Sequence, residues 1–105
     1  MLELNKFDIT VSTTVAPPNN ALIKEVDLSS ANSDTSLGIS GSGFGIKYFD
    51  GNFTLKIQTT GGTILILDSR YIYINDYFKI DFSDILITNT AQAGKKLIIY
   101  YDWRS

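Results

Sequence analysis

Cysteine and histidine are both absent from this 105-residue sequence. Their absence excludes disulfides, thiolate nucleophiles, zinc sites built from cysteine and histidine, and imidazole general bases. Most hydrolytic and redox active sites use at least one of these groups. We therefore expect a protein that works through its surfaces and through assembly, that is not an enzyme, and that holds no cofactor or metal.

The sequence also lacks clusters of charge and long apolar segments. Its nine basic and eleven acidic side chains are scattered, with a formal net charge of −2, whereas a phosphate-binding surface needs clustered Lys and Arg. No window approaches the roughly 20 apolar residues that a membrane-spanning helix requires, and the amino terminus lacks the pattern of a secretory signal. We expect no nucleic-acid partner, no membrane partner, and a chain made without secretory processing.

What the chain does contain is typical of one small globular domain. Hydrophobic residues make up 44% of the chain and charged residues 19%, as in ordinary folded proteins rather than disordered ones. A chain of this length has enough apolar side chains for a single core and too few for two. Residues 1–105 are therefore predicted to form one domain.

Apolar and polar residues alternate in short runs, which is the pattern of half-buried β-strands. No window shows the three-to-four spacing of apolar residues that an amphipathic helix requires. The predicted fold class is all-β, a single-domain antiparallel β-sandwich or jelly-roll-like barrel of about eight strands with little or no helix. The predicted strand segments before the last quarter of the chain are 7–15, 22–28, 46–49, 53–60, 63–67, 71–74 and 77–82.

Short turns between these runs predict hairpins. Gly61-Gly62 is a two-residue link between alternating runs, and Asp50-Gly51-Asn52 is a tight-turn tripeptide of the kind that joins hairpin strands. The last quarter, 79–101, consists of two apolar-alternating runs joined by a short Ala/Gly connection, and it is interpreted as a further hairpin. In that hairpin Leu97 and Ile99 pair back across the turn.

Residues 29–45 form the longest irregular region, rich in Ser, Asn, Asp, Thr and Gly. Long connections are often functional, so this region is the first place to look for a contact site. The plainer interpretation is a surface loop with a short strand around Leu37–Ile39. Its glycines do not have the spacing of a phosphate-binding loop, and no Lys-Ser/Thr pair closes it.

Carboxylates at Asp68, Asp76, Asp81 and Asp84 are the candidates for catalytic groups or calcium ligands. A glycoside hydrolase needs two carboxyl groups about 5–10 Å apart, and nothing in the spacing selects a pair. No Asp-x-Asp-x-Asp-Gly pattern of a calcium loop is present. Asp68 and Asp76 are explained as turn residues whose side chains bond nearby backbone amides.

Six tyrosines and one tryptophan are many for a small domain, and such residues anchor protein interfaces and stack on sugars. Tyr71 and Tyr73 share one strand face and, together with Phe44, are candidate contacts for a partner protein or a glycan. The run 63–67 is apolar on both faces, which suits a strand covered from two sides. The predicted oligomer interface comprises Ile64, Leu65, Ile66, Tyr100, Tyr101 and Trp103.

The segment from Phe82 to Tyr100, FSDILITNTAQAGKKLIIY, resembles the carboxy-terminal hairpin of small tailed-bacteriophage virion proteins. The resemblance covers about the last half of the chain, since short β segments at 54–62 and 71–75 fit the same kind of protein. It implies a virion structural protein, either a capsid decoration or cement protein or a β-domain of the tail, baseplate or head fibre. It further implies a homotrimer that binds a phage major capsid or tail protein, located in the virion and made in the host cytoplasm.

Two other functions compete with this interpretation. In a carbohydrate-binding β-sandwich, accessible tyrosines stack on sugar faces while loop Asp and Asn side chains bind hydroxyl groups. An oligonucleotide-binding barrel needs a basic groove interleaved with aromatic residues, and the acidic balance of the chain disfavours it.

Overall fold

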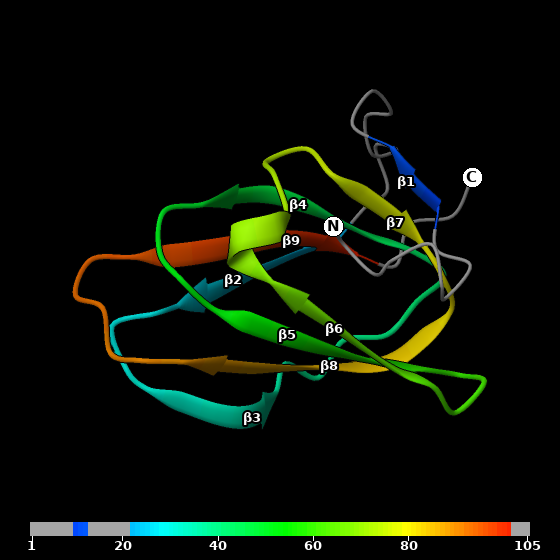
Figure 1. The fold of residues 1–105 in the computed structure, drawn as a ribbon, viewed down its shortest axis with the longest axis horizontal. Coiled ribbons are helices and arrows are strands. Elements are labelled where there is room, and N and C mark those ends of the chain that lie inside the picture. The colour runs from blue at the N-terminus through cyan, green and yellow to red at the C-terminus, as the bar shows by residue number, and fades with distance from the viewer. Residues whose placement is uncertain (1–9, 13–21, 102–105) are drawn as a thin grey trace.

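The computed structural model describes residues 10–12 and 22–101, which form nine strands and no α-helix (Figure 1). A single 3-10 turn, η2 (Ser69–Tyr71), follows the sixth strand. The all-β fold class is confirmed. The strands are β1 (Thr10–Ser12), β2 (Leu22–Asp27), β3 (Asn32–Ser36), β4 (Phe44–Phe49), β5 (Thr54–Thr59), β6 (Ile64–Asp68), β7 (Tyr77–Lys79), β8 (Phe82–Asn89) and β9 (Lys96–Tyr101).

The strands form two antiparallel sheets packed as a sandwich, one with the order β1-β7-β4-β9-β2 and the other with the order β3-β8-β5-β6 (Figure 1). The pairing is nested along the chain, because β2 pairs with β9, β3 with β8, β4 with β7 and β5 with β6. This is the arrangement of a jelly roll, in which one long antiparallel ribbon is rolled into two sheets. The predicted sandwich of jelly-roll type is therefore observed, with β1 added at one edge.

The nested pairing overturns two predicted hairpins. β8 and β9 lie in different sheets, so segment 79–101 is not a hairpin, and β8 instead pairs with β3 and β5. Asp50-Gly51-Asn52 likewise joins β4 to β5 across the sandwich rather than within one sheet. The Gly61-Gly62 hairpin is confirmed, because β5 pairs with β6 and Gly62 has a positive φ of 91°. Alternation along a strand predicts its faces but does not identify its partner.

Two predicted strands also differ from the structure. The segment around Leu37–Ile39 is not a strand, although both apolar side chains are buried in the core, and the strand lies just before it at Asn32–Ser36. Residues 71–74 are not a strand either, because they leave η2 and continue as a turn toward β7. For the predicted strand 7–15, the described part is the strand Thr10–Ser12, and the remainder lies outside the described residues.

The core lies between the sheets and is built from inward-facing aliphatic and phenylalanine side chains. Phe44 is at its centre, stacked on Phe78 with 4.9 Å between ring centroids and edge-on to Phe82 at 5.5 Å. Only 1% of Phe44 is exposed. The prediction that Phe44 contacts a partner or glycan is therefore wrong, because β4 places the ring between the two sheets.

A β-bulge in β8 allows Phe82 and Ile85, which are three positions apart, to face the core together. Thr59 pairs with Phe82 whereas Gln58 pairs with Asp84, so Ser83 is the extra residue in β8. The extra residue changes the phase of the alternation, and as a result Phe82 and Ile85 both face the core. A register shift in β4 changes the alternation in the same way, so that Ile46 and Phe49 both pack in or against the core.

Candidate functional site

The surface of strand β6 carries two exposed isoleucines. Ile64 is 52% exposed and Ile66 is 60% exposed, whereas Leu65 and Leu67 point into the core and are 1% and 0% exposed. β6 lies at the edge of its sheet, and among the described strands it pairs only with β5. The run therefore has one face in the sandwich and one face open to contact. The prediction that Leu65 belongs to an oligomer interface is wrong, because its side chain is buried in the core.

Tyr71 and Tyr73 are both accessible, with 48% and 69% exposure. Ile72 between them is 2% exposed and anchors the segment in the core. The Tyr73 N–H donates to a carboxylate oxygen of Asp76 at 2.8 Å, which holds the turn in place. The Arg70 guanidinium lies 5.3 Å from the centroid of the Tyr71 ring. The two tyrosines are thus presented by a link whose backbone is fixed.

The other predicted interface residues lie at the end of β9. Tyr101 is half-buried and packs against the core, and Tyr100 is half-buried on the outer face of the five-stranded sheet. Trp103 lies outside the described residues. The structure therefore does not bring Tyr100 and Tyr101 together with Ile64 and Ile66, since β9 and β6 belong to different sheets.

Tyr100 forms part of a shallow hollow of about 550 Å³ on that outer face. In this hollow the Lys47 Nζ lies 5.1 Å from the Tyr100 ring centroid and donates to the Tyr100 hydroxyl at 3.3 Å. Lys96 Nζ lies 6.0 Å from the Tyr48 ring centroid. Each lysine thus sits over an aromatic face, a favourable cation–π geometry. The hollow is lined by Lys47, Tyr48, Asn75, Lys96, Ile98 and Tyr100.

The electrostatics of this hollow include one nearby carboxylate. The Tyr48 hydroxyl donates to Asp50 at 3.2 Å, and the negative charge of Asp50 raises the pKa of Tyr48. The backbone N–H of Lys96 also donates to Asp50 and lowers the pKa of that carboxyl. Two ammonium groups and two aromatic rings would suit a ligand that combines an apolar face with negative charge. Sequence reasoning missed this group, because its members are on β4, β9 and the turn before β7.

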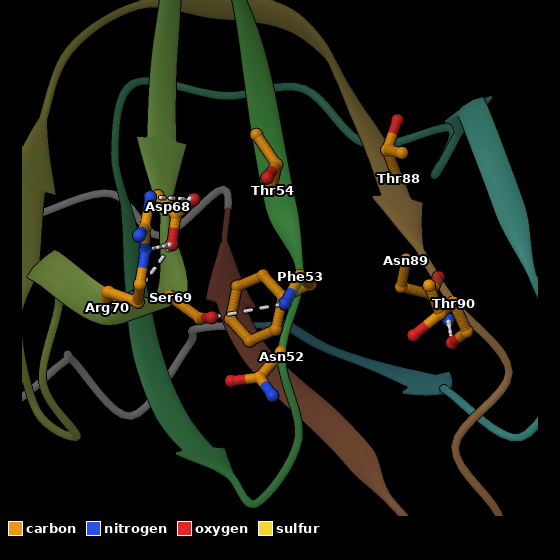
Figure 2. Close-up of a pocket in the computed structure, with 9 residues that line it drawn as sticks. All are labelled: Asn52, Phe53, Thr54, Asp68, Ser69, Arg70, Thr88, Asn89 and Thr90. Carbon is orange, nitrogen blue, oxygen red and sulfur yellow. Dashed lines mark hydrogen bonds and ion pairs between the residues drawn. The ribbon is translucent and has the colours of Figure 1, made fainter.

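A second hollow, of about 360 Å³, lies where β5 begins and β6 and β8 end (Figure 2). Figure 2 shows Asp68 and Arg70 on one side of the Phe53 segment and Thr88 to Thr90 on the other. Its polar groups bond to one another and to neighbouring segments; the Thr88 hydroxyl, for example, donates to Asp34. The Phe53 N–H donates to the Ser69 hydroxyl at 3.1 Å. The hollow is lined by Asn52, Phe53, Thr54, Asp68, Ser69, Arg70, Thr88, Asn89 and Thr90.

Asp68 is the carboxylate of this hollow, and Arg70 neutralises it. The Arg70 backbone N–H donates to Asp68 at 2.9 Å and its Nε at 3.1 Å. These bonds, the backbone one first, lower the pKa of Asp68. An ionised carboxylate that caps η2 in this way is a hydrogen-bond acceptor and not a proton donor at neutral pH. The arrangement fastens the end of β6 to the start of the link that follows it.

The described part of the chain contains no group of three or more Asp or Glu side chains placed to hold a metal ion. Within residues 10–12 and 22–101, no helix has the length and apolar character needed to cross a membrane. Comparisons with known protein families, with curated proteins and with solved structures found no match. The class defined by the fold is a jelly-roll β-sandwich, and its function has to be inferred from its surfaces.

Proposed function

We propose that this protein is a structural component of a tailed-bacteriophage virion, a capsid decoration or cement protein or a tail-associated β-domain. It acts by contact with copies of itself and with a major capsid or tail protein. The observation that carries the proposal is the exposure of apolar side chains that the core does not use, led by Ile64 and Ile66 on the open edge of β6. Exposed apolar side chains on an open edge strand indicate a surface that is covered in the assembled state.

The fold is consistent with this role, since double-sheet jelly rolls are common among viral capsid proteins and lectins. That support is an association at the level of fold, because one fold serves many functions. The sequence adds the resemblance of segment 82–100 to phage virion proteins. In the structure that segment forms two strands in different sheets, so the resemblance is one of amino-acid sequence and not of a shared hairpin.

Within this proposal the two exposed surfaces have different roles. The β6 edge contacts another copy of the chain, and Tyr71 and Tyr73 contact the capsid or tail protein. Tyrosine combines a large apolar area with a hydroxyl group and loses little conformational entropy when it is covered, so it suits a hot spot in an interface. Many modest contacts of this kind, repeated over a particle, give strong attachment by multivalency.

The test is co-expression with the capsid and tail proteins encoded beside this chain, followed by purification of the particles and detection of the bound protein. We expect the chain to copurify with shells or tails, and Tyr73→Ala to lower its occupancy. Tyr48→Ala, which alters an exposed tyrosine on the five-stranded sheet, is the matched control and should leave occupancy unchanged. Particles that assemble normally but never carry the chain would overturn the proposal.

A second candidate function is recognition of a glycan, and the hollow lined by Lys47, Tyr48, Lys96 and Tyr100 favours it. Aromatic rings next to ammonium groups suit sugars that bear a carboxylate. An array of neutral and acidic glycans tests this directly. Binding that is lost in Lys96→Ala would place the glycan in this hollow, binding lost in Tyr73→Ala would place it on the exposed tyrosines, and no binding to any glycan would remove this candidate.

A further inference from the structure

Strand β6 is an edge strand of its sheet. The structure determines which of its residues bond to β5 and which direct their backbone groups toward the open side. At one end of the β5–β6 ladder the Thr59 N–H donates to the Thr63 carbonyl at 2.9 Å, and at the other end the Ser69 N–H donates to the Phe53 carbonyl at 2.9 Å. Directly bonded pairs alternate in an antiparallel ladder. The odd-numbered residues of β6 therefore bond to β5.

The even-numbered residues, Ile64, Ile66 and Asp68, direct their backbone groups away from β5, toward the open side of the strand. Each carries one N–H donor and one C=O acceptor. The side chains of Ile64 and Ile66 are the two exposed ones. The same two residues thus supply both the backbone groups that no described strand pairs with and the exposed apolar area of this edge.

The other edges with described side chains are guarded against pairing. β2, at the edge of the five-stranded sheet, exposes Leu22 and Ile23 at its start, but its next residues include the charged Lys24, Glu25 and Asp27. β3, at the far edge of the sheet that contains β6, is wholly polar and has a register shift, with Asp34 at a positive φ of 46°. Charges and irregular backbone are the usual means of blocking edge-to-edge pairing. β6 has neither within its four apolar residues.

We propose that β6 pairs antiparallel with β6 of a second copy of this chain, which joins the two four-stranded sheets into one continuous sheet. A two-fold contact of this kind is self-complementary and closes at two copies. It is therefore a dimer contact, and it differs from the homotrimer implied by the resemblance to phage proteins. The pairing rests on the assembly role proposed above.

The register of the pairing follows from the side chains. Outward-facing residues must lie opposite outward-facing residues, and one such register places Ile64 of each copy opposite Ile66 of the other. Registers shifted by two residues in either direction instead place an isoleucine opposite Asp68 or opposite the glycine turn. A parallel pairing would set Asp68 beside Asp68 of the second copy. The antiparallel register with matched isoleucines avoids both costs.

The contact is short, because β6 has five residues. An interface of one strand pair is smaller than a standard stable interface, so we expect association at about micromolar concentration or weaker. On a particle, additional contacts with the shell would hold the copies together more firmly.

Sedimentation velocity over a range of about 1 µM to 1 mM tests the proposal. The wild type should form a dimer as concentration rises, and Ile66→Lys should remain a monomer throughout, because lysine on an edge blocks pairing. Ile23→Lys is the matched control, since Ile23 is 57% exposed on the edge strand β2, and it should dimerise like the wild type. A wild type that is monomeric over the whole range, or that forms a trimer, overturns the proposal.

Amide hydrogen exchange of the wild type, measured by NMR at both ends of that range, tests strand pairing without any substitution. The amides of Ile64 and Ile66 should exchange at least about tenfold more slowly in the dimer. Those of Leu65 and Leu67 bond to β5 and should be protected at both concentrations. A dimer in which Ile64 and Ile66 exchange as fast as in the monomer would show that the copies meet through side-chain faces, and strand pairing would be rejected.

Failure of this inference can be distinguished from failure of the proposed function. A monomeric chain that still occupies particles through Tyr73 rejects only the β6 pairing. A dimer that never joins particles leaves the pairing intact and rejects the virion role.

Discussion

Gly51 lies in the link from β4 to β5, where a side chain has no room. A Cβ added there would lie 2.8 Å from Leu28 Cδ1 and 2.9 Å from Gln92 Oε1 and Lys95 Cβ. We expect Gly51→Ala to lower the free energy of unfolding by about 1–3 kcal/mol, because overpacking moves neighbouring groups. Urea denaturation measures the loss. Gly61→Ala is the matched control, since an added Cβ there has no neighbour closer than 4.0 Å, and equal losses in the two variants would contradict the steric explanation.

Asp76 is a carboxylate placed in the protein interior with one oxygen unpaired. It is 4% exposed, and among the described atoms its Oδ1 has no hydrogen-bond partner, while Oδ2 accepts from the Tyr73 N–H. Burial raises the pKa of Asp76 above its ordinary value of 3.8. The folded protein therefore binds this proton more tightly than the unfolded chain does.

The raised pKa of Asp76 makes the stability of the fold depend on pH. The contribution of Asp76 to stability is fully present below the unfolded pKa and is lost as pH rises through the raised pKa of the folded state. Asp76→Asn keeps an acceptor for the Tyr73 N–H but carries no charge. We expect its free energy of unfolding, relative to the wild type, to increase from acidic to neutral pH.

Urea unfolding at several pH values checks this expectation. The difference between variant and wild type isolates Asp76 from other groups, such as Asp68, whose lowered pKa gives the opposite slope. Asp81→Asn, at an exposed position, is the control for loss of a carboxylate as such. A difference that stays constant with pH would show that Asp76 titrates alike in the folded and unfolded chains.

The end of β8 holds together two of the links that cross between the sheets. The Asn89 side-chain amide lies within 3.3 Å of the carbonyls of Leu28, Ser30 and Thr90 and donates to them. Its oxygen accepts from the Asn32 side chain at 2.8 Å. Asn89 is 7% exposed. One buried amide thus connects the link from β2 to β3 with the link from β8 to β9.

We expect Asn89→Ala to lower the free energy of unfolding by about 1–3 kcal/mol, because it leaves buried carbonyls without donors. Asn89→Asp should cost more, because it turns a second oxygen toward those carbonyls. Asn52→Ala is a suitable control, since Asn52 bonds to Gln92 through its backbone N–H and carbonyl. Thermal or urea unfolding measures all three variants, and a loss in Asn52→Ala as large as that in Asn89→Ala would count against the role of the buried amide.

The elements that could be predicted from sequence are those whose signals are local. Gly61-Gly62 predicted the β5–β6 hairpin because the turn and both strands lie within one short segment. Segment 79–101 looks equally local, but its connection crosses the sandwich, and nothing in an alternating pattern distinguishes the two cases. β3 was missed because Asn32–Ser36 has no apolar residue, and it is held instead by backbone pairing with β8.

The same limit applies to the surfaces. The sequence identified the apolar run of β6, but not that Leu65 faces inward while Ile64 and Ile66 face outward. It singled out Tyr100, yet the lysine over its ring comes from a bulged position in β4. Contacts between segments distant in the chain depend on strand order, which periodicity alone does not determine.

The nested topology makes the two sheets dependent on each other. From β2 to β9, the link between β5 and β6 is the one that stays within a sheet, and each of the others crosses the sandwich. Neither sheet can separate without breaking the core that both share. We therefore expect the described strands β2 to β9 to unfold as one cooperative unit.

Native-state hydrogen exchange measures this cooperativity. The slowest amides of β5 and β8 in one sheet, and of β4 and β9 in the other, should report the same free energy of opening, because both exchange through global unfolding. Asn89→Ala should lower both values by the same amount although Asn89 belongs to only one sheet. Gly61→Ala serves as the control, because it alters the one link that stays within a sheet and should move neither value. A drop confined to the sheet that contains β8 would mean that the sheets open separately, and the rolled-ribbon topology would then not govern stability.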